Sequence, residues 1–262
     1  MTPRPLHLTH ARADRFKDQS VVDAYPLRWP YPPETFEVLA GLMVDRPGAV
    51  LDAGTGTGDI ARPFVKHVGR VDAVDVSAPM LAQARILPGG EHPKLRWIES
   101  SMEDCVTDSE YALVTAGESL HWMDWDIVLP RFRELLKPAG LLAIIHRSEA
   151  PIPWQDGLAG LIATYSTVRN YELFDLIAEL ERRRLFEVRG RHKTTPVAFR
   201  QPVAKYIESF HSRSSLSREN MPPGAADAFD RELRALVAPW AGDGVVALQT
   251  MADMVWGEPL AG

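Results

Sequence analysis

The chain has 262 residues, of which 45% are apolar, and a formal net charge of -6 at pH 7. This length allows one large domain, or one domain with a cap, to bury a substantial core. The negative charge excludes a general attraction to phosphate backbones, and we interpret the one basic cluster, at 182–193, as a solvated helix end. Nucleic acid is therefore not expected as a partner.

Cysteine content and hydropathy bear on the cellular compartment. Cys105 is the only cysteine, so no internal disulfide can form. The N-terminal segment lacks the apolar stretch of a signal peptide, and no run of about 18 apolar residues occurs in the sequence. We expect a cytoplasmic protein, a monomer or homodimer, with no membrane partner.

Apolar and amphipathic segments alternate in the first half of the chain. Strands are predicted at 49–54, 71–76, 94–100, 111–117 and 140–147. Helices are predicted between them at 59–68, 79–85 and 126–136. Strands that alternate with helices need crossover connections, which produce a parallel sheet covered on both faces. The Pro and Gly of 137–140 are expected to end a helix and turn the chain into the fifth strand.

The pattern changes after residue 148. Helices without intervening strands are predicted within 151–185, which suggests an insertion rather than another crossover. An extended segment at 186–199, helices at 203–212 and 225–237, and a final apolar stretch near the C-terminus follow.

Three glycines stand at alternate positions in VLDAGTGTGDI (50–60), directly after the first predicted strand. In a doubly wound sheet, ligands bind outside the carboxyl ends of the strands. Gly54, Gly56 and Gly58 allow positive φ and let a ligand lie against the main chain, where free backbone N–H groups could donate to it. The segment predicts a ligand site, with a purely structural tight turn as the alternative.

Two cofactors compete for this loop. Gly56-x-Gly58-x-x-Ala61 fits the dinucleotide fingerprint, and Asp75, about 20 residues further on, could bind a ribose hydroxyl. Asp75 suits S-adenosylmethionine equally well, because its carboxylate could accept hydrogen bonds from both ribose hydroxyls.

The acids that flank the loop distinguish the two cofactors. Asp52 precedes the glycines and Asp59 follows them. Carboxylates repel a pyrophosphate but suit a cationic amino-acid group, such as the methionine end of S-adenosylmethionine. The sequence therefore favours S-adenosylmethionine over a nicotinamide dinucleotide.

Four segments together carry a family resemblance: VLDAGTGTGDIA (50–61), VDAVDVSAPMLAQAR (71–85), SLHWMD (119–124) and RFRELLKPAGLLA (131–143). In order and spacing they resemble the class I S-adenosylmethionine-dependent methyltransferases, in particular the small-molecule group described as methyltransferase type 11 or 12-like. The resemblance implies an α/β, doubly wound, mostly parallel seven-stranded sheet of Rossmann-like form. Its last two strands would come from 186–199 and 244–256.

The resemblance also implies a division of the chain. We expect an N-terminal arm or helical lid at 1–46, an S-adenosylmethionine-binding core at 47–148, a helical insertion after the fifth strand at 149–185 that caps the acceptor, and the C-terminal part of the core sheet with helices at 186–262.

The residues that match the family's cofactor pattern are Tyr25, Arg28, Asp52, Gly54, Gly56, Gly58, Asp75, Val76, Met80, Ser101, Met102, Glu103 and Gly117. Asp52 and its glycines would surround the methionine part, Asp75 would bind the ribose, and Met80 would lie on the adenine. Ser101 stands where the family often has an acid. Arg28 would pair with the cofactor carboxylate, and the aromatic side chains of the arm would shelter the sulfonium.

The acceptor side is expected at the end of the fourth strand. AGESLHWMD (116–124) lacks the Asn/Asp-Pro-Pro-Tyr motif of nucleic-acid amino-methyltransferases, which favours a small-molecule methyl acceptor. His121 and His146 are the candidate catalytic bases, and packing of the loop is the alternative role for His121. The predicted acceptor-binding residues are Tyr31, Trp122, Trp154, Tyr165, Arg169, His211 and Arg213.

These expectations define a reaction. A sulfonium methyl is already activated, so in-line transfer to the acceptor needs mainly proximity and orientation, and no metal. The alternatives are a non-catalytic cofactor-binding or regulatory protein on the same fold, and an NAD(P)-dependent oxidoreductase.

Overall fold

A computed structural model describes residues 14–107, 110–168 and 174–260. The chain forms two compact units, each built from three separate segments. Unit 1 comprises Met1–Pro30, Glu149–Leu173 and Pro196–Thr250, and unit 2 comprises Tyr31–Ser148, Phe174–Thr195 and Met251–Gly262. The four functional segments expected from the sequence are a different kind of division, which these units do not test.

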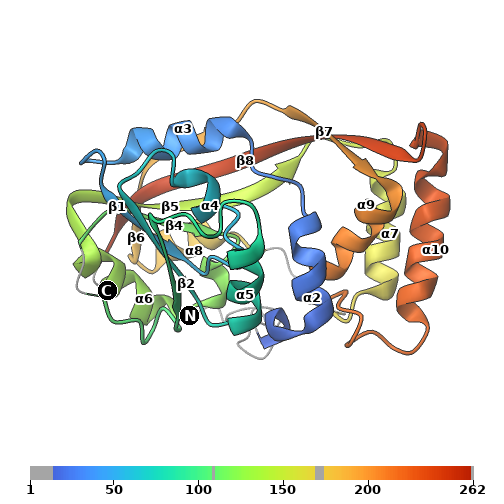
Figure 1. The fold of residues 1–262 in the computed structure, drawn as a ribbon, viewed down its shortest axis with the longest axis horizontal. Coiled ribbons are helices and arrows are strands. Elements are labelled where there is room, and N and C mark those ends of the chain that lie inside the picture. Colours follow the sequence, from blue (N-terminus) through green and yellow to red (C-terminus); the bar gives the residue numbers. More distant parts are fainter. Residues whose placement is uncertain (1–13, 108–109, 169–173, 261–262) are drawn as a thin grey trace. The chain divides into compact units, whose positions relative to one another are not determined.

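The strands of the described residues, most of them in unit 2, form the predicted doubly wound sheet (Figure 1). Their order is β3-β2-β1-β4-β5-β8-β6, and β7 pairs with β8 beside this path. The strands are β1 (Ala49–Ala53), β2 (Arg70–Asp75), β3 (Leu95–Glu99), β4 (Tyr111–Gly117), β5 (Leu136–Glu149), β6 (Phe186–Lys193), β7 (Val197–Pro202) and β8 (Val245–Pro259). The pairs from β3 to β5 are parallel, whereas β6 and β7 pair antiparallel with β8. The predicted fold class is confirmed.

Helices cover both faces of the sheet in unit 2. Among its helices are α3 (Pro33–Leu42), α4 (Ala61–Phe64), α5 (Ala78–Ile86), α6 (Trp125–Leu135) and α8 (Leu176–Arg182). The side chains of β1 alternate between two apolar clusters, since Val50 packs with α3 and α4 whereas Leu51 packs with α6 and α8. Figure 1 shows α3 and α6 on opposite faces of the sheet.

Two local predictions differ from the structure in their bounds. The helix after the glycine loop is α4, shorter than the predicted 59–68, because residues 56–60 form turns. Strand β5 begins at Leu136, ahead of the predicted 140, and Ala139 has a φ of 63°. The register shifts between the pairs Tyr111↔Leu136 and Leu113↔Leu141, so the Pro and Gly of 137–140 form an irregularity inside a strand rather than a break before it.

Unit 1 is mainly helical. Its α-helices are α2 (Gln19–Ala24), α7 (Gln155–Tyr165), α9 (Val203–Ser209) and α10 (Ala225–Val237). Phe229, Leu233 and Val237 recur every four residues on α10 and are fully buried, so one face of this helix packs against α7 and α9. The 15-residue strand β8 begins in unit 1, where β7 pairs with it, and continues into unit 2 beyond Thr250.

Candidate cofactor and acceptor site

The glycine loop follows β1, which lies between β2 and β4, where the strand order changes direction. Such a switch point is the usual ligand position in an open α/β sheet. Gly54, Gly56 and Gly58 have φ values of 67°, 56° and 78°. A Cβ on Gly54 would stand 2.5 Å from the Cβ of Ser119, and one on Gly58 would stand 2.4 Å from the ring of Trp97. Both conformation and packing therefore require glycine at 54 and 58.

The backbone donors of the loop already have partners within the protein. The N–H of Thr55 donates to the Val74 carbonyl (2.9 Å), that of Gly56 to Asp75 Oδ2 (2.7 Å), and that of Gly58 to the Thr55 carbonyl (2.9 Å). The expectation that these N–H groups would be free for a ligand is wrong at these three positions. The loop offers bare main-chain surface rather than a set of donors.

Asp75 ends β2 beside this loop. Its Oδ1 accepts a hydrogen bond from the Ser77 N–H at 2.8 Å, and its Oδ2 accepts the bond from Gly56. Burial raises the pKa of Asp75, and the backbone donors act in the opposite direction. Each carboxylate oxygen has a second lone pair, so the side chain retains acceptor capacity for a ribose diol.

Asp52 lies at the end of β1 and is 2% exposed. Its Oδ2 accepts a hydrogen bond from Thr55 Oγ1 at 2.5 Å, and its Oδ1 accepts one from Thr115 Oγ1 at 2.7 Å. Burial, with smaller contributions from the charges of Asp75 and Asp59, raises the pKa of Asp52 to about 6 against the effect of both hydroxyls. No cation among the described residues forms an ion pair with Asp52, so this site fits the cationic end of a ligand.

Asp59, by contrast, has two cations of its own. Its carboxylate forms ion pairs with Arg62 at 3.0 Å and with Arg147. Burial alone would raise its pKa, but the two guanidinium groups lower it. The guanidinium carbon of Arg147 also lies 4.3 Å from the ring centroid of Tyr31. The prediction that acids on both sides of the loop suit a cationic ligand therefore applies to Asp52 and not to Asp59.

The residues expected around the adenine lie after β2 and β3. Met80 is 1% exposed on α5, where Ser77 Oγ accepts from its N–H at 3.3 Å, and Val76 is exposed. Ser101 Oγ bonds Asp104 Oδ2 at 2.8 Å in a local turn, with Met102 buried behind it.

Glu103 has a structural contact of its own. Its Oε1 accepts a hydrogen bond at 2.8 Å from the N–H of Asp124, the residue that caps α6. The adenine contacts themselves stay predictions.

The ends of β4 and β5 form a second polar group. The register pair Gly117↔Ile145 brings Glu118 next to His146, and the two side chains meet with Glu118 Oε1 2.8 Å from His146 Nδ1. The N–H of Arg147 donates to the same oxygen at 2.5 Å. Glu118 has a φ of 57°, a strained conformation for a residue with a side chain.

The pKa values of this pair move apart. Burial raises the pKa of Glu118, but the hydrogen bond and charge of His146 and the N–H of Arg147 lower it to about 2. The hydrogen bond to Glu118 raises the pKa of His146, and burial opposes that shift. The carboxylate therefore holds a proton on Nδ1 of His146.

Four other predicted residues belong to unit 2: Tyr31, Gly117, His121 and Trp122. A Cβ on Gly117 would stand 2.3 Å from Ile60 Cδ1 and 3.0 Å from the hydroxyl oxygen of Tyr31, so both side chains pack closely against this glycine. His121 and Trp122 lie in the 3-10 helix η4 (Leu120–Trp122), with ring centroids 4.7 Å apart. Contact between these rings agrees with the packing role that the sequence left open for His121.

The remaining predicted residues lie in unit 1. Arg28 stacks over Tyr25 with its guanidinium carbon 4.0 Å from the ring centroid, and its Nε and Nη2 donate to Ser212. Trp154 is 4% exposed and donates to Tyr206 at 3.0 Å. These contacts fix the side chains within unit 1 and leave their ligand roles as predictions.

Two more predicted acceptor residues of unit 1 are also held by neighbours. The hydroxyl of Tyr165 donates to Glu232 at 2.5 Å, and Arg213 lies over the ring of Phe210. Arg169 lies outside the described residues.

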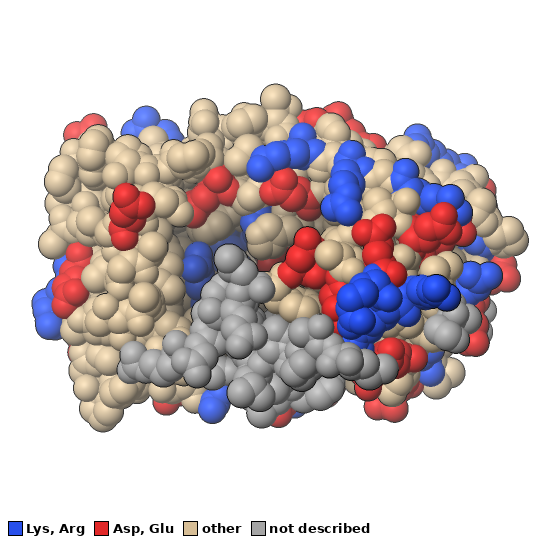
Figure 2. Space-filling model, turned by 180° about the vertical axis from the view of Figure 1, so that it is seen from behind, with Lys and Arg blue, Asp and Glu red and all other residues tan. Residues whose placement is uncertain are grey.

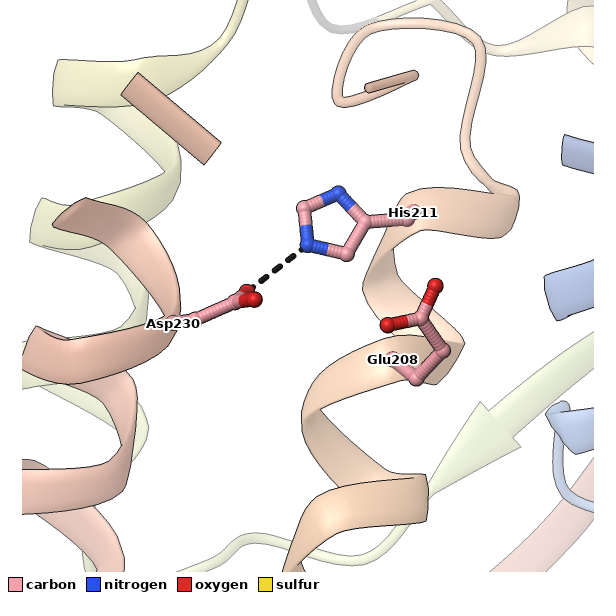
Figure 3. A group of neighbouring side chains, drawn as sticks. All are labelled: Glu208, His211 and Asp230. Carbon is pink, nitrogen blue, oxygen red and sulfur yellow. Dashed lines mark hydrogen bonds and ion pairs between the residues drawn. The ribbon is translucent and has the colours of Figure 1, made fainter. Parts of the chain in front are cut away.

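His211 belongs to a cluster with Glu208 and Asp230, whose ligand atoms lie within 4.8 Å of one another (Figure 3). The spacing alone would suit a metal ion. However, the Arg218 guanidinium donates to Glu208 at 2.6 Å and to Asp230 at 2.8 Å. His211 is fully buried, and its ring nitrogens contact the Leu216 carbonyl and Asp230. The cluster is a closed ion-pair network, and His211 has no ring nitrogen left for an acceptor.

Surface charge agrees with the composition. Figure 2 shows basic and acidic side chains interspersed on the face that it draws, rather than separated into fields of one sign. Within the part of the chain that the structure describes, no helix is long and apolar enough to cross a membrane.

Glu118 and Thr115 are functional candidates that the sequence analysis did not select. Glu118 follows the β4 glycine, as His146 follows Ile145 on the neighbouring strand, and the ends of adjacent parallel strands meet at one edge. That shared position was the available signal for Glu118. Thr115 is hidden inside an apolar strand, and only the register Asp52↔Thr115 reveals its role.

Comparison with known proteins agrees with this geometry. Residues 50–140 match the family model described as a methyltransferase domain. A malonyl-[acyl-carrier protein] O-methyltransferase of Halalkalibacterium halodurans is 33% identical over 37% of this chain and 38% of its own length. A ubiquinone biosynthesis O-methyltransferase of Nitrobacter winogradskyi is 26% identical over 63% of this chain and 59% of its own length. The chain thus spans less than two thirds of either relative.

A solved structure extends the likeness beyond the matched segment. A protein of Anaeromyxobacter dehalogenans, whose assignment as a type II methyltransferase is itself a proposal, is 21% identical with a TM-score of 0.65. The match covers 90% of this chain and 99% of that one, which establishes the shared fold. Residues 50–140, which carry the glycine loop, Asp75 and the β4 edge, belong to the class I S-adenosylmethionine-dependent methyltransferase domain family.

Proposed function

We propose that this protein transfers a methyl group from S-adenosylmethionine to a small-molecule acceptor. The observation that carries the proposal is Asp52, a buried carboxyl group with no cation partner among the described residues, beside a bare glycine loop and Asp75 at the switch point of the sheet. This arrangement lies within the segment that matches the methyltransferase domain.

The residues of the chain act mainly by positioning. S-adenosylmethionine, when bound, supplies the activated methyl group. Asp75 would hold the ribose hydroxyls, and Asp52 would hold the cationic end of the methionine part. Holding the acceptor in line at this edge of the sheet supplies the entropic part of the acceleration, worth up to about 7 to 11 kcal/mol in well-oriented systems.

The two named relatives support an oxygen acceptor, because both are called O-methyltransferases. In unit 2, Tyr31 and Trp122 are the residues proposed to bind the methyl acceptor. Trp154, Tyr165 and Arg213 stay proposed contributors from unit 1.

Calorimetry tests the cofactor. We expect S-adenosylhomocysteine to bind and NAD not to bind. Asp75→Ala should weaken S-adenosylhomocysteine about 100-fold or more, since two hydrogen bonds to a charged group are worth roughly 1.5 to 3 kcal/mol each. Asp45→Ala, which removes an exposed carboxylate that pairs with Lys137, is the matched control and should bind normally.

Two results would contradict the proposal. Equal affinity in Asp75→Ala would reject the ribose assignment, and preferential binding of NAD would favour an oxidoreductase. Turnover against carboxylic acids, phenols and amines then separates an enzyme from a silent cofactor-binding protein, which would bind S-adenosylhomocysteine and methylate none of them.

A further inference from the structure

Glu118 and His146 form a carboxylate–imidazole pair at the edge where the acceptor is expected. Nδ1 of His146 faces Glu118 at 2.8 Å, and the His146 side chain is 69% exposed, whereas that of Glu118 is 21% exposed. Among the described residues, no hydrogen-bond partner of His146 Nε2 is found. The imidazole is thus anchored on one nitrogen and open to solvent on the other.

The anchor is rigid. The N–H of Glu118 donates to the Ile145 carbonyl at 3.0 Å, and its carboxylate accepts from the N–H of Arg147 at 2.5 Å. Glu118 keeps this position at the cost of a left-handed φ of 57°. Strain of this kind persists where the surroundings enforce it, and it is concentrated at functional sites.

We propose that His146 is the general base of the methyl transfer, with Glu118 as the residue that positions it, and that the acceptor is a phenolic or enolic hydroxyl. This inference rests on the proposed function. A carboxylate acceptor has no proton to lose, so a base poised at this edge indicates an acceptor that has one.

The step balances without a further reactant. The acceptor oxygen uses a lone pair to form the O–CH₃ bond, and the electron pair of the broken S–CH₃ bond stays on sulfur. The hydroxyl proton moves to Nε2 of His146, where the adjacent Glu118 stabilises the imidazolium, and it then passes to water. Carboxylate-oriented imidazole bases act in this way in other enzymes.

The charged groups around the pair set its pH response. His146 senses Glu118 from β4, Asp253 from β8 and Lys193 from β6, of which the first two raise its pKa and the last lowers it. His121 acts in turn on Glu118. Because neutral imidazole is the base, kcat/KM should rise as pH increases through the pKa of His146.

The first test needs no acceptor. An NMR titration of the imidazole carbon protons, assigned through His146→Ala, should give His146 a pKa above its ordinary value of about 6.5. Glu118→Gln should return it toward that value. His192→Ala is the matched control, because it removes a second His–Glu pair (His192 Nε2 to Glu34 Oε1, 2.7 Å) on β6. An unchanged His146 titration in Glu118→Gln would overturn the positioning role.

The second test compares two acceptors of different acidity. Phenol, with a pKa like that of tyrosine at about 10, needs a base, whereas the far more acidic 4-nitrophenol is largely ionised at pH 8. His146→Ala should lower kcat/KM for phenol by about 10²- to 10⁴-fold, and for 4-nitrophenol by less than about tenfold. Glu118→Gln should show a smaller loss with the same preference and a lower pH midpoint, and His192→Ala should match wild type.

The possible results distinguish failure of the general base, failure of the acceptor class and failure of the proposed function. Equal losses on both phenols, or a wild-type rate that falls as pH rises through the His146 pKa, would overturn the base. A protein that binds S-adenosylhomocysteine but methylates neither phenol would overturn the acceptor class. Failure to bind S-adenosylhomocysteine would instead overturn the proposed function itself.

Discussion

Asp52 on β1 is a buried carboxyl group and Glu118 after β4 a half-buried one at the same edge of the sheet, and the protein holds them in opposite ways. Asp52 accepts hydrogen bonds from two threonine hydroxyls, and its pKa rises to about 6. Glu118 faces an imidazole and a backbone N–H, and its pKa falls to about 2. Neutral hydroxyls do not offset the desolvation of a carboxylate, whereas a neighbouring positive charge does.

The difference indicates what each carboxyl group does. Glu118 already has a hydrogen-bond partner in His146, so its charge is committed to holding that ring. Within the part of the chain that the structure describes, Asp52 has no cation partner, and a cationic ligand would complete its site. At pH values near 6, a cationic ligand would therefore favour the ionised form of Asp52.

The largest expected effect comes from removing the charge of Glu118. Glu118→Gln should lower the free energy of unfolding by about 2 kcal/mol at pH 7, after allowance for the exposure of His146. The folded pKa is lowered, so this contribution is present above the ordinary pKa of 4.5 and is lost as pH falls toward about 2. Urea denaturation of both proteins between pH 7 and 3 should show the gap closing in acid.

Glu118→Gly separates charge from backbone strain. Glycine accepts a φ of 57° at no steric cost. Glu118→Gly should therefore be about 1 kcal/mol more stable than Glu118→Gln, which loses the charge but keeps the strained backbone. A pH-independent gap between wild type and Glu118→Gln would contradict the ion pair.

The second effect concerns Asp52 and the ligand. Wild-type affinity for S-adenosylhomocysteine should increase as pH rises through about 6, because the ionised carboxylate holds the ligand's ammonium group. Asp52→Asn should bind about tenfold more weakly at pH 8, roughly 1.4 kcal/mol, and should show no such rise. Calorimetry between pH 5 and 8 measures both.

Without a ligand, the folding stability of the protein should change with pH in the opposite direction: ionisation of Asp52 should lower it. The folded pKa of Asp52 is raised, so its contribution to stability is present below the ordinary 3.8 and is lost as pH rises through about 6. A ligand affinity that follows the same pH curve in wild type and Asp52→Asn would remove Asp52 from the cationic end of the site.

Part of the fold and of the candidate site could be predicted from the sequence alone. The glycine loop, Asp52 and Asp75 are consecutive with the strands that position them, so local patterns were sufficient to select them. The doubly wound, mostly parallel sheet followed because strands alternated with helices, and the structure confirms it. The bounds of α4 and β5 were predicted wrongly, since turns and a strand irregularity replaced the expected helix start and strand break.

Contacts between residues that are distant in the sequence could not be predicted from local patterns. Glu118 and His146 are separated by a helix and meet only through strand register. The pairing of Asp59 with Arg147 likewise depends on the fold, and it reversed the interpretation of one loop acid. In unit 1, the ion-pair network of His211 depends on the packing of α9, α10 and the segment after α9, which no periodicity encodes.

The smallest effect tests the hydroxyls that hold Asp52. Thr115→Val keeps the shape of the side chain but removes the donor to Asp52 Oδ1, leaving a buried acceptor at a cost of about 1 kcal/mol. Because that donor lowers the pKa of Asp52, its loss should move the pH midpoint of S-adenosylhomocysteine binding above about 6. Thr107→Val, which removes a hydroxyl 2.8 Å from the Tyr111 hydroxyl, is the control and should leave the midpoint in place. If the pH midpoint of S-adenosylhomocysteine binding is also unchanged in Thr115→Val, a group other than Asp52 governs the pH dependence of binding.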